Sequence, residues 1–297
     1  MENTTAVWEQ NANIRPAPIS WQEIKKVRHK AEKPLLILSV IITVVGYFLI
    51  TVGVIGLTIE PELTVEAGLV EGDMLALYGI IAAPFLLIFA LYNIFARTRA
   101  YSIRVTEKNF PEIYHKSVEF AERLGLKKVP PVYIQQQNGK INAFAAAVFG
   151  KRYAKLHAEL VDVAYLHNDF ETVYFVLAHE FGHIYLKHVT IPFNIFTFLA
   201  RMIPVYGSMF SRAKEFSCDR IAQLLANSNG AREMMLLPAG RHLYRHIDLD
   251  DYFETLKKES GIFLWYVNMM ASHPVPVKRL AALIDPEKKS GKLLFGT

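Results

Sequence analysis

Residues 176–186 read VLAHEFGHIYL, an apolar stretch that carries two histidines and one glutamate. Residues four apart lie on one face of an α-helix, so His179 and His183 can present their imidazoles to a single ion. Glu180 lies beside the first histidine, within reach of a water bound to that ion. The alternative is a buried helix whose two histidines are ordinary core residues. The spacing therefore favours a metal site on a helix, provided that a third ligand lies elsewhere in the chain.

The chemistry of these side chains favours zinc, with one ion per chain. Neutral imidazoles bind zinc, and a coordination position left to water creates a nucleophile near neutral pH. Glu180 would then act as the general base, taking a proton from the water and later handing it to the leaving amine.

A catalytic zinc site of this kind needs a third protein ligand. Residues 214–221 read KEFSCDRI and place Glu215 and Asp219 four residues apart, on one helical face. Glu215 would complete the ligand set, and Asp219 would orient a histidine through its other ring nitrogen. Taken alone the pair is more typical of a solvated helix face, but the upstream motif favours the ligand interpretation. Cys218 is expected to be a small buried residue, and His188 to lie on the surface.

Two long apolar runs indicate a membrane protein. The chain has 297 residues, of which 52% are hydrophobic, and residues 35–57 and 75–96 carry no charge. A soluble core helix rarely stays apolar all round for this length, so both runs are predicted to span a membrane. Pro84 is expected to kink the second span.

The charges that flank the two runs predict their orientation. Basic residues precede the first run and follow the second, namely Lys25, Lys26, Arg28, Lys30 and Lys33, then Arg97, Arg99, Arg104 and Lys108. The loop between the runs carries Glu60, Glu62, Glu66, Glu71 and Asp73, and it has no Lys or Arg. The positive-inside rule then places both ends of the hairpin in the cytoplasm, as in a bacterial inner membrane. The net charge of +5 lies beside the apolar runs, which favours a lipid surface over nucleic acid.

The apolar hairpin divides the chain into parts. These are a cytoplasmic segment 1–34, a transmembrane hairpin 35–96 and a globular domain 97–297. In the globular domain, helices are predicted over 111–124 and from 170 to about 188, the second with Asn168 or Asp169 as its N-cap. Short strands are predicted over 132–137, 140–149 and 152–160.

Residues 191–210 are apolar enough to suggest a third span, but the ligand set argues against it. A single crossing would put Glu215 on the opposite side of the bilayer from His179, and two crossings need about 40 residues. The segment is therefore expected to be helical and to lie against the membrane or line the cleft.

The order of the motifs resembles a known family. HEFGH, then EFSCD, then Ser272-His273-Pro274, with Asn142-Ala143-Phe144 before the first motif, looks like the membrane zinc peptidases, gluzincins that include bacterial HtpX, the type I CAAX prenyl protease and the mitochondrial Oma-type proteases. The resemblance covers about residues 105–284. It implies an α+β, mostly helical, zincin-like domain with a small sheet whose edge flanks the metal helix.

The resemblance also implies roles for individual residues. It makes His179, His183 and Glu215 the zinc ligands and Glu180 the base, with Asp219 in support. His273 would help to stabilise the oxyanion of the tetrahedral intermediate, with Arg279 nearby in contact with substrate. Asn142 would border the cleft, where a substrate peptide adds to the strand edge. Both Ser-His-Pro and Asn142 are also typical of ordinary turns.

Together these features predict a membrane-anchored zinc metalloendopeptidase. It would cleave membrane or misfolded polypeptides by attack of zinc-activated water, and the resemblance implies a role in proteolytic quality control. The alternatives are a CAAX-type prenyl-protein protease, which encloses its site within several spans, and a non-catalytic scaffold that zinc stabilises. The oligomeric state and the cleavage-site preference stay open.

Overall fold

A computed structural model describes residues 17–258 and 261–284. Residues 1–16, in the predicted N-terminal segment, lie outside the described residues. So do residues 285–297, at the end of the predicted globular domain.

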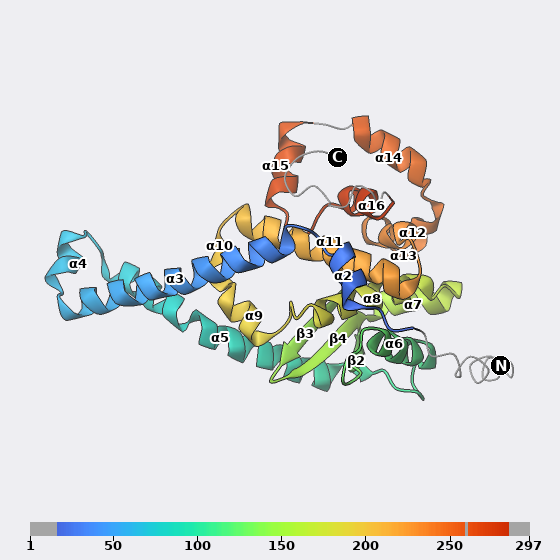
Figure 1. Ribbon diagram of the computed structural model, residues 1–297, viewed down its shortest axis with the longest axis horizontal. Helices are drawn as coiled ribbons and strands as arrows, with labels where there is room; N and C mark the ends of the chain where they lie inside the picture. Colours follow the sequence, from blue (N-terminus) through green and yellow to red (C-terminus); the bar gives the residue numbers. More distant parts are fainter. Residues whose placement is uncertain (1–16, 259–260, 285–297) are drawn as a thin grey trace.

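Two long helices extend from the globular part, close together at their far ends and diverging toward it (Figure 1). They are α3 (Glu32–Ile59) and α5 (Glu71–Tyr101), joined at the far end by the short helix α4 (Glu62–Glu66). Both are long and apolar enough to cross a membrane, as predicted, and α5 continues as a helix through Pro84. In the most apolar stretch of each helix, only 11% of the residues of α3 and 0% of those of α5 are buried, so neither is the core helix of a soluble domain. This exposure suggests association with a membrane.

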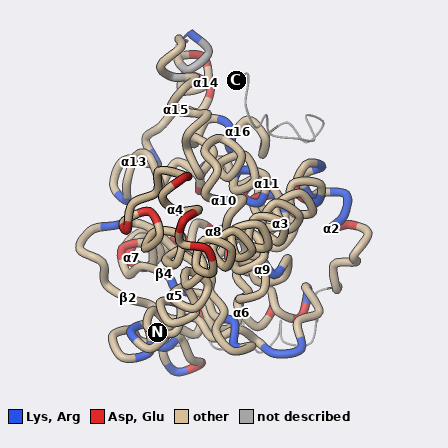
Figure 2. The backbone as a smooth tube through the Cα atoms, turned by 90° about the vertical axis from the view of Figure 1, so that its left-hand side faces the viewer, with Lys and Arg blue, Asp and Glu red and all other residues tan. Residues whose placement is uncertain are grey.

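The turn between the two helices is acidic. Figure 2 looks at the molecule from the α4 end, and acidic residues gather there without any basic residue. The charge asymmetry read from the sequence is therefore also an asymmetry in space, with the basic residues at the other end of the helices.

A mixed four-stranded sheet supports the globular part, in the order β1-β2-β4-β3. Its strands are β1 (Ile103–Arg104), β2 (Val132–Gln135), β3 (Ala143–Val148) and β4 (Lys151–His157). β2 and β4 are parallel, whereas β3 and β4 form an antiparallel hairpin in which Val148 pairs with Lys151. Phe149 and Gly150 make the turn with φ of 46° and 76°, as a two-residue hairpin requires. β3 is therefore left at an edge of the sheet.

Three helices pack on the sheet and around its core: α6 (Pro111–Arg123), α7 (Ala158–His167) and α8 (Glu171–Tyr185). The predicted helix over 111–124 and the three predicted strands are confirmed within a few residues. α7 was not predicted, because its first residues had been taken as the end of a strand. α8 carries the HEFGH motif and is buried along almost its whole length.

The predicted N-cap of α8 is wrong. Phe170 occupies that position, and it makes no side-chain capping hydrogen bond. Asn168 instead ends α7 in the left-handed conformation, with φ of 50°. Asp169 accepts hydrogen bonds from the hydroxyl of Tyr244 and the guanidinium of Arg245.

The helix α11 (Tyr206–Ala226) lies along α8 and carries the EFSCD motif. The two helices approach closely at Gly182, where a Cβ atom would stand 3.3 Å from the Cα atom of Cys218. Between them the chain forms the short helices α9 (Ile191–Phe196) and α10 (Phe198–Met202). Residues 191–210 are thus helical and do not form a third span, as expected.

Both flanks of the long helices contact the globular part. Before α3, the helix α2 (Trp21–Val27) packs against α11 and buries Ile24 completely. Ile24, which lies before the first apolar run, is therefore part of the core of the globular domain. The remaining elements are α12 (Ala231–Met234), α13 (Leu236–Leu243), η1 (Tyr244–His246), α14 (Leu249–Lys258), α15 (Ile262–Met270) and α16 (Pro276–Ile284).

Candidate metal centre

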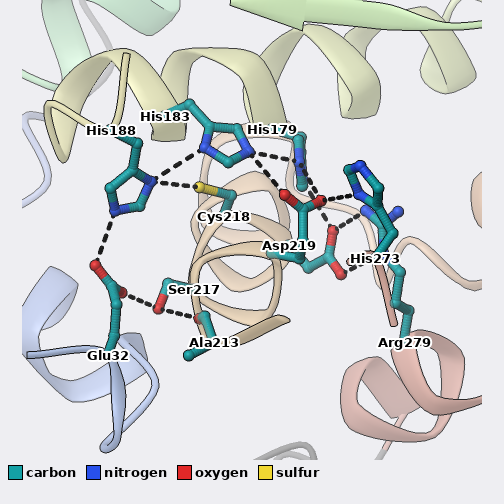
Figure 3. A network of polar contacts seen from close by, with 11 residues as sticks. Glu32, His179, His183, His188, Ala213, Ser217, Cys218, Asp219, His273 and Arg279 are labelled. Carbon is teal, nitrogen blue, oxygen red and sulfur yellow. Dashed lines mark hydrogen bonds and ion pairs between the residues drawn. The ribbon is translucent and has the colours of Figure 1, made fainter. Parts of the chain in front are cut away.

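The packing of α8 on α11 brings three potential ligands together, of which His179 and His183 are labelled in Figure 3. The Nε2 atoms of His179 and His183 lie 3.1 Å apart. The two carboxylate oxygens of Glu215 each lie 3.4 Å from one of these nitrogens. His179 and Glu215 are 7% and 5% exposed, so the cluster is shielded from bulk water.

The geometry of this cluster fits a tetrahedral metal ion. Zinc–ligand bonds of about 2.0–2.1 Å place tetrahedral ligand atoms about 3.3–3.4 Å apart. The Nε2–Nε2 separation of 3.1 Å and the two Nε2–carboxylate separations of 3.4 Å, one to each oxygen of Glu215, are close to that spacing. Two imidazoles and one carboxylate are also a common donor set for a catalytic zinc ion that keeps one position open. The residues present therefore fit the metal that the sequence predicts.

Asp219 fixes the orientation of the first histidine. The Nδ1 atom of His179 donates a hydrogen bond to Asp219 over 2.8 Å, which leaves the lone pair of Nε2 directed at the cluster. Burial raises the pKa of the Asp219 carboxyl, but the Arg279 guanidinium and the hydrogen bond from His179 outweigh it and lower that pKa. Asp219 thus stays ionised in a site where it is only 1% exposed.

Arg279 lines the cavity near the cluster, as expected, but its side chain is paired with Asp219. Its guanidinium donates to both oxygens of Asp219, over 2.8 and 2.5 Å, and the residue is only 8% exposed. These contacts favour a structural role, in which Arg279 neutralises Asp219, over the contact with substrate implied by the resemblance.

Glu180 is also buried next to the cluster, with 7% of its surface exposed. Burial raises the pKa of its carboxyl, although nearby histidines and the backbone of Ala145 act in the opposite direction. Ala145 lies on β3, so the edge strand and the proposed base are direct neighbours, as expected for a sheet edge that flanks the metal helix.

His273 lies over the open side of the cluster. It belongs to the loop before α16, and its Nδ1 atom is 3.2 Å from an oxygen of Glu215. Its side chain is 69% exposed, so it can reach a molecule bound in front of the ligands.

Asn142 stands at the start of the edge strand. Its side-chain oxygen accepts a hydrogen bond from the backbone of Ala143, and its carbonyl accepts one from the backbone of His157. It also lines the cavity in front of the metal cluster. The structure thus brings Asn142 to the site. Its side chain, however, bonds to the backbone of the next residue, as is common in turns.

A cavity of about 580 Å³ lies in front of the cluster. One wall is the edge strand β3, and Glu180 and His273 also line it. Asn194 and Arg201 from α9 and α10 and Leu91 from the long helix α5 also line the cavity. The cavity therefore extends from the metal ligands to one of the two apolar helices.

The surface position predicted for His188 is wrong. This residue is 5% exposed, and its Nδ1 atom lies 3.1 Å from Nδ1 of His183. The chain turns back after α8 because Lys187 adopts a positive φ of 63°, which no sequence pattern of lysine indicates.

Cys218 is fully buried, as expected, and burial raises the pKa of its thiol well above the usual value.

Comparison with known proteins supports a class for this site. Residues 107–200 match the family described as Peptidase family M48, which is 94 of the 297 residues of the chain. The matched region includes strands β2, β3 and β4 and the helix α8 with both histidines, and it ends before Glu215. The match supports a peptidase of the M48 metallopeptidase family. No curated protein and no solved structure matches the chain.

Proposed function

We propose that this protein is a membrane-anchored, zinc-dependent metalloendopeptidase. The proposal is carried by the cluster of His179, His183 and Glu215, in which the two Nε2 atoms lie 3.1 Å apart and each lies 3.4 Å from a different carboxylate oxygen of Glu215. Glu180 lies buried beside them in the same cavity, where a structural metal site would need no such group.

The chain's own residues can carry out the remaining steps of peptide hydrolysis. A bound zinc ion would polarise the peptide carbonyl and lower the pKa of a water. Glu180 takes the proton of the attacking water and delivers it to the nitrogen of the leaving amine. His273 donates a hydrogen bond to the oxygen that gains negative charge in the transition state.

The edge strand β3 suits an extended peptide as the substrate. Its outer edge has no partner among the described strands, so its backbone groups can pair with an added strand. Recognition through the backbone depends little on side chains, which favours loose sequence specificity. Asn142, at the start of this strand, would lie beside the bound peptide.

Several features support membrane polypeptides as the substrates. The two exposed apolar helices anchor the protein, and the positive-inside rule places the site on the cytoplasmic side, as in a bacterial inner membrane. Leu91 of the second span lines the same cavity as the metal ligands, so the site begins close to the bilayer.

Such an enzyme would be suited to proteolytic quality control, in the manner of the HtpX-type peptidases. A CAAX-type protease is less well supported, because the described residues contain two candidate spans rather than an enclosing set.

The test compares the purified protein with its Glu180→Gln variant in mild detergent. Both are measured for zinc content and for cleavage of an unfolded protein, and the exposed Glu122→Gln variant serves as the matched control. We expect about one zinc ion per chain in all of them, with cleavage lost only in Glu180→Gln. Zinc without cleavage in the parent would favour a zinc-stabilised scaffold, and a parent without zinc would overturn the metal site.

A further inference from the structure

A second chain of polar contacts starts at His183 and is not used by the proposed mechanism (Figure 3). Nδ1 of His183 lies 3.1 Å from Nδ1 of His188, and Nε2 of His188 lies 2.8 Å from a carboxylate oxygen of Glu32. Glu32 is the first residue of α3, the first apolar helix, and 156 residues separate it from His188. The contacts thus connect a metal ligand to the start of a membrane helix.

Glu32 is held firmly at this position. It is only 1% exposed, and Arg28 donates to it over 2.6 Å. Its second oxygen accepts a hydrogen bond from the hydroxyl of Ser217, which in turn accepts one from the backbone of His29. A buried carboxylate is costly unless it is paired and hydrogen-bonded. These partners meet that requirement and fix the direction in which Glu32 faces His188.

One arrangement of protons satisfies every contact in this chain. Nε2 of His183 faces the metal cluster, so it must offer a lone pair and the ring proton sits on Nδ1. That proton is donated to Nδ1 of His188, which therefore acts as an acceptor. The proton of His188 then sits on Nε2 and is donated to Glu32. Both histidines are neutral in this arrangement, and each N–H has one acceptor.

We propose that Glu32 and His188 are positioning residues for His183, and that they couple metal affinity to the position of the first membrane helix. Hydrogen bonds to the second nitrogen of a metal-binding histidine fix its tautomer and ring orientation. Asp219 does this directly for His179, whereas His183 is held through His188. A shift of α3 relative to α8 would withdraw Glu32 and release His183. This proposal rests on the proposed metal site.

A second metal site is the competing explanation for the same cluster. Donor atoms of His183, His188 and Cys218 lie close enough to hold an ion. However, His183 would then have to lose both ring protons and bridge two ions. The Sγ atom of Cys218 lies 3.8 Å from Nδ1 of His188, at the outer limit of a hydrogen bond to sulfur. The hydrogen-bonded chain His183–His188–Glu32, which we call the relay, explains the contacts with both histidines neutral and without a further ion.

The experiment measures zinc affinity of the full chain in detergent by competition with a chelator. We expect His188→Leu to weaken zinc binding about 10–100-fold, the effect typical of lost outer partners of metal-binding histidines. His188→Gln should recover most of this loss, because its side-chain carbonyl can still accept the proton of His183. Glu32→Gln should weaken binding in the same direction. The matched control is His157→Gln, another buried histidine, which contacts the carbonyl of Lys140 instead of the metal cluster.

The outcomes separate this proposal from the proposed function. Wild-type affinity in both Glu32→Gln and His188→Leu overturns the relay and leaves the zinc site intact. Equal loss in His188→Leu and His188→Gln also overturns it, since a merely structural role gives no rescue. Two zinc ions per chain, one of them lost in Cys218→Ser, would replace the relay with a second metal site. A parent protein that binds no zinc overturns the proposed function, and the relay falls with it.

Discussion

The carboxylate of Asp219 holds His179, a proposed metal ligand, on one side and the guanidinium of Arg279 on the other. Removing one partner of a buried ion pair leaves an uncompensated charge, which is worse than removing both. We therefore expect Arg279→Met to lower stability by about 3 kcal/mol and to weaken zinc binding. The measurement is the thermal unfolding midpoint of the apoprotein together with chelator competition.

The double variant Arg279→Met with Asp219→Asn should recover much of this stability, since no unpaired charge remains. Arg245→Met is the matched control, because its ion pair with Asp169 is partly exposed and should contribute less than about 1 kcal/mol. Equal losses in Arg279→Met and Arg245→Met would contradict the structural role of Arg279.

The sequence was informative about this site wherever the partners share one helix. His179 with His183, and Glu215 with Asp219, follow from helical spacing, and the structure places each pair on one face. The contacts of Arg279 and Glu32 were not predicted. They join residues 60 and 156 positions apart, and only the packing of helices determines such pairs.

The contact between α8 and α11 determines how far apart the ligands lie. A side chain at Gly182 would meet the Cα atom of Cys218 at 3.3 Å and its Sγ atom at 3.4 Å, so one helix must move by a few tenths of an ångström. His183 follows Gly182 on α8, and Glu215 precedes Cys218 on α11. We therefore expect Gly182→Ala to weaken zinc binding and Gly182→Val to abolish it, as measured by chelator competition.

Gly79→Ala in α5 is the control for this series, because a Cβ atom there has nothing within 4 Å. It should leave zinc binding unchanged. If Gly182→Val binds zinc as tightly as the parent, the two helices can separate without moving the ligands, and the spacing argument fails.

Elements were predictable where their pattern is local. The two apolar helices, α6 and the β3–β4 hairpin follow from hydropathy, from Pro111 at a helix start and from the turn at Gly150. The boundary between β4 and α7 was missed, because Ala158 to Leu160 suits a strand or a helix and tertiary packing decides between them. The turns at Lys187 and Val205, on either side of α9 and α10, were also beyond prediction, since both residues adopt positive φ values that their side chains do not favour.

The orientation of the whole molecule can be tested by labelling single cysteines. The positive-inside rule puts the acidic turn between the two long helices outside the cytoplasm. Glu66→Cys in this turn should react with a membrane-impermeant maleimide in intact spheroplasts, whereas Lys127→Cys should react only after permeabilisation. Both positions are exposed, and native Cys218 is fully buried and contributes little background. The reverse pattern would place the metal site on the other side of the membrane.

The depth of the site in the bilayer follows from how α10 meets α3. The backbone N–H of Ala200 donates to the hydroxyl of Thr43, and a Cβ atom on Gly46 would meet Leu199 at 2.9 Å. Thr43 lies eight residues beyond Leu35, where the uncharged run begins, which is about 12 Å along the helix. Since the apolar core of a bilayer is about 30 Å thick, we expect α9 and α10 to lie well inside one leaflet.

Two polar side chains of this segment satisfy backbone carbonyls, which suits such a depth because irregular backbone in a membrane must have its hydrogen bonds satisfied within the protein. Thr197 donates to the carbonyl of Phe193, and Asn194 donates to that of Thr190. Phe196 and Met202 are 49% and 62% exposed and would face lipid. In lipid vesicles, cysteines at these two positions should resist a water-soluble maleimide and react in detergent, whereas Leu166→Cys on α7 should react in both. Rapid labelling of Phe196→Cys in vesicles would put α9 and α10 in water, and substrates would then have to reach the cavity from the cytoplasm rather than from the bilayer.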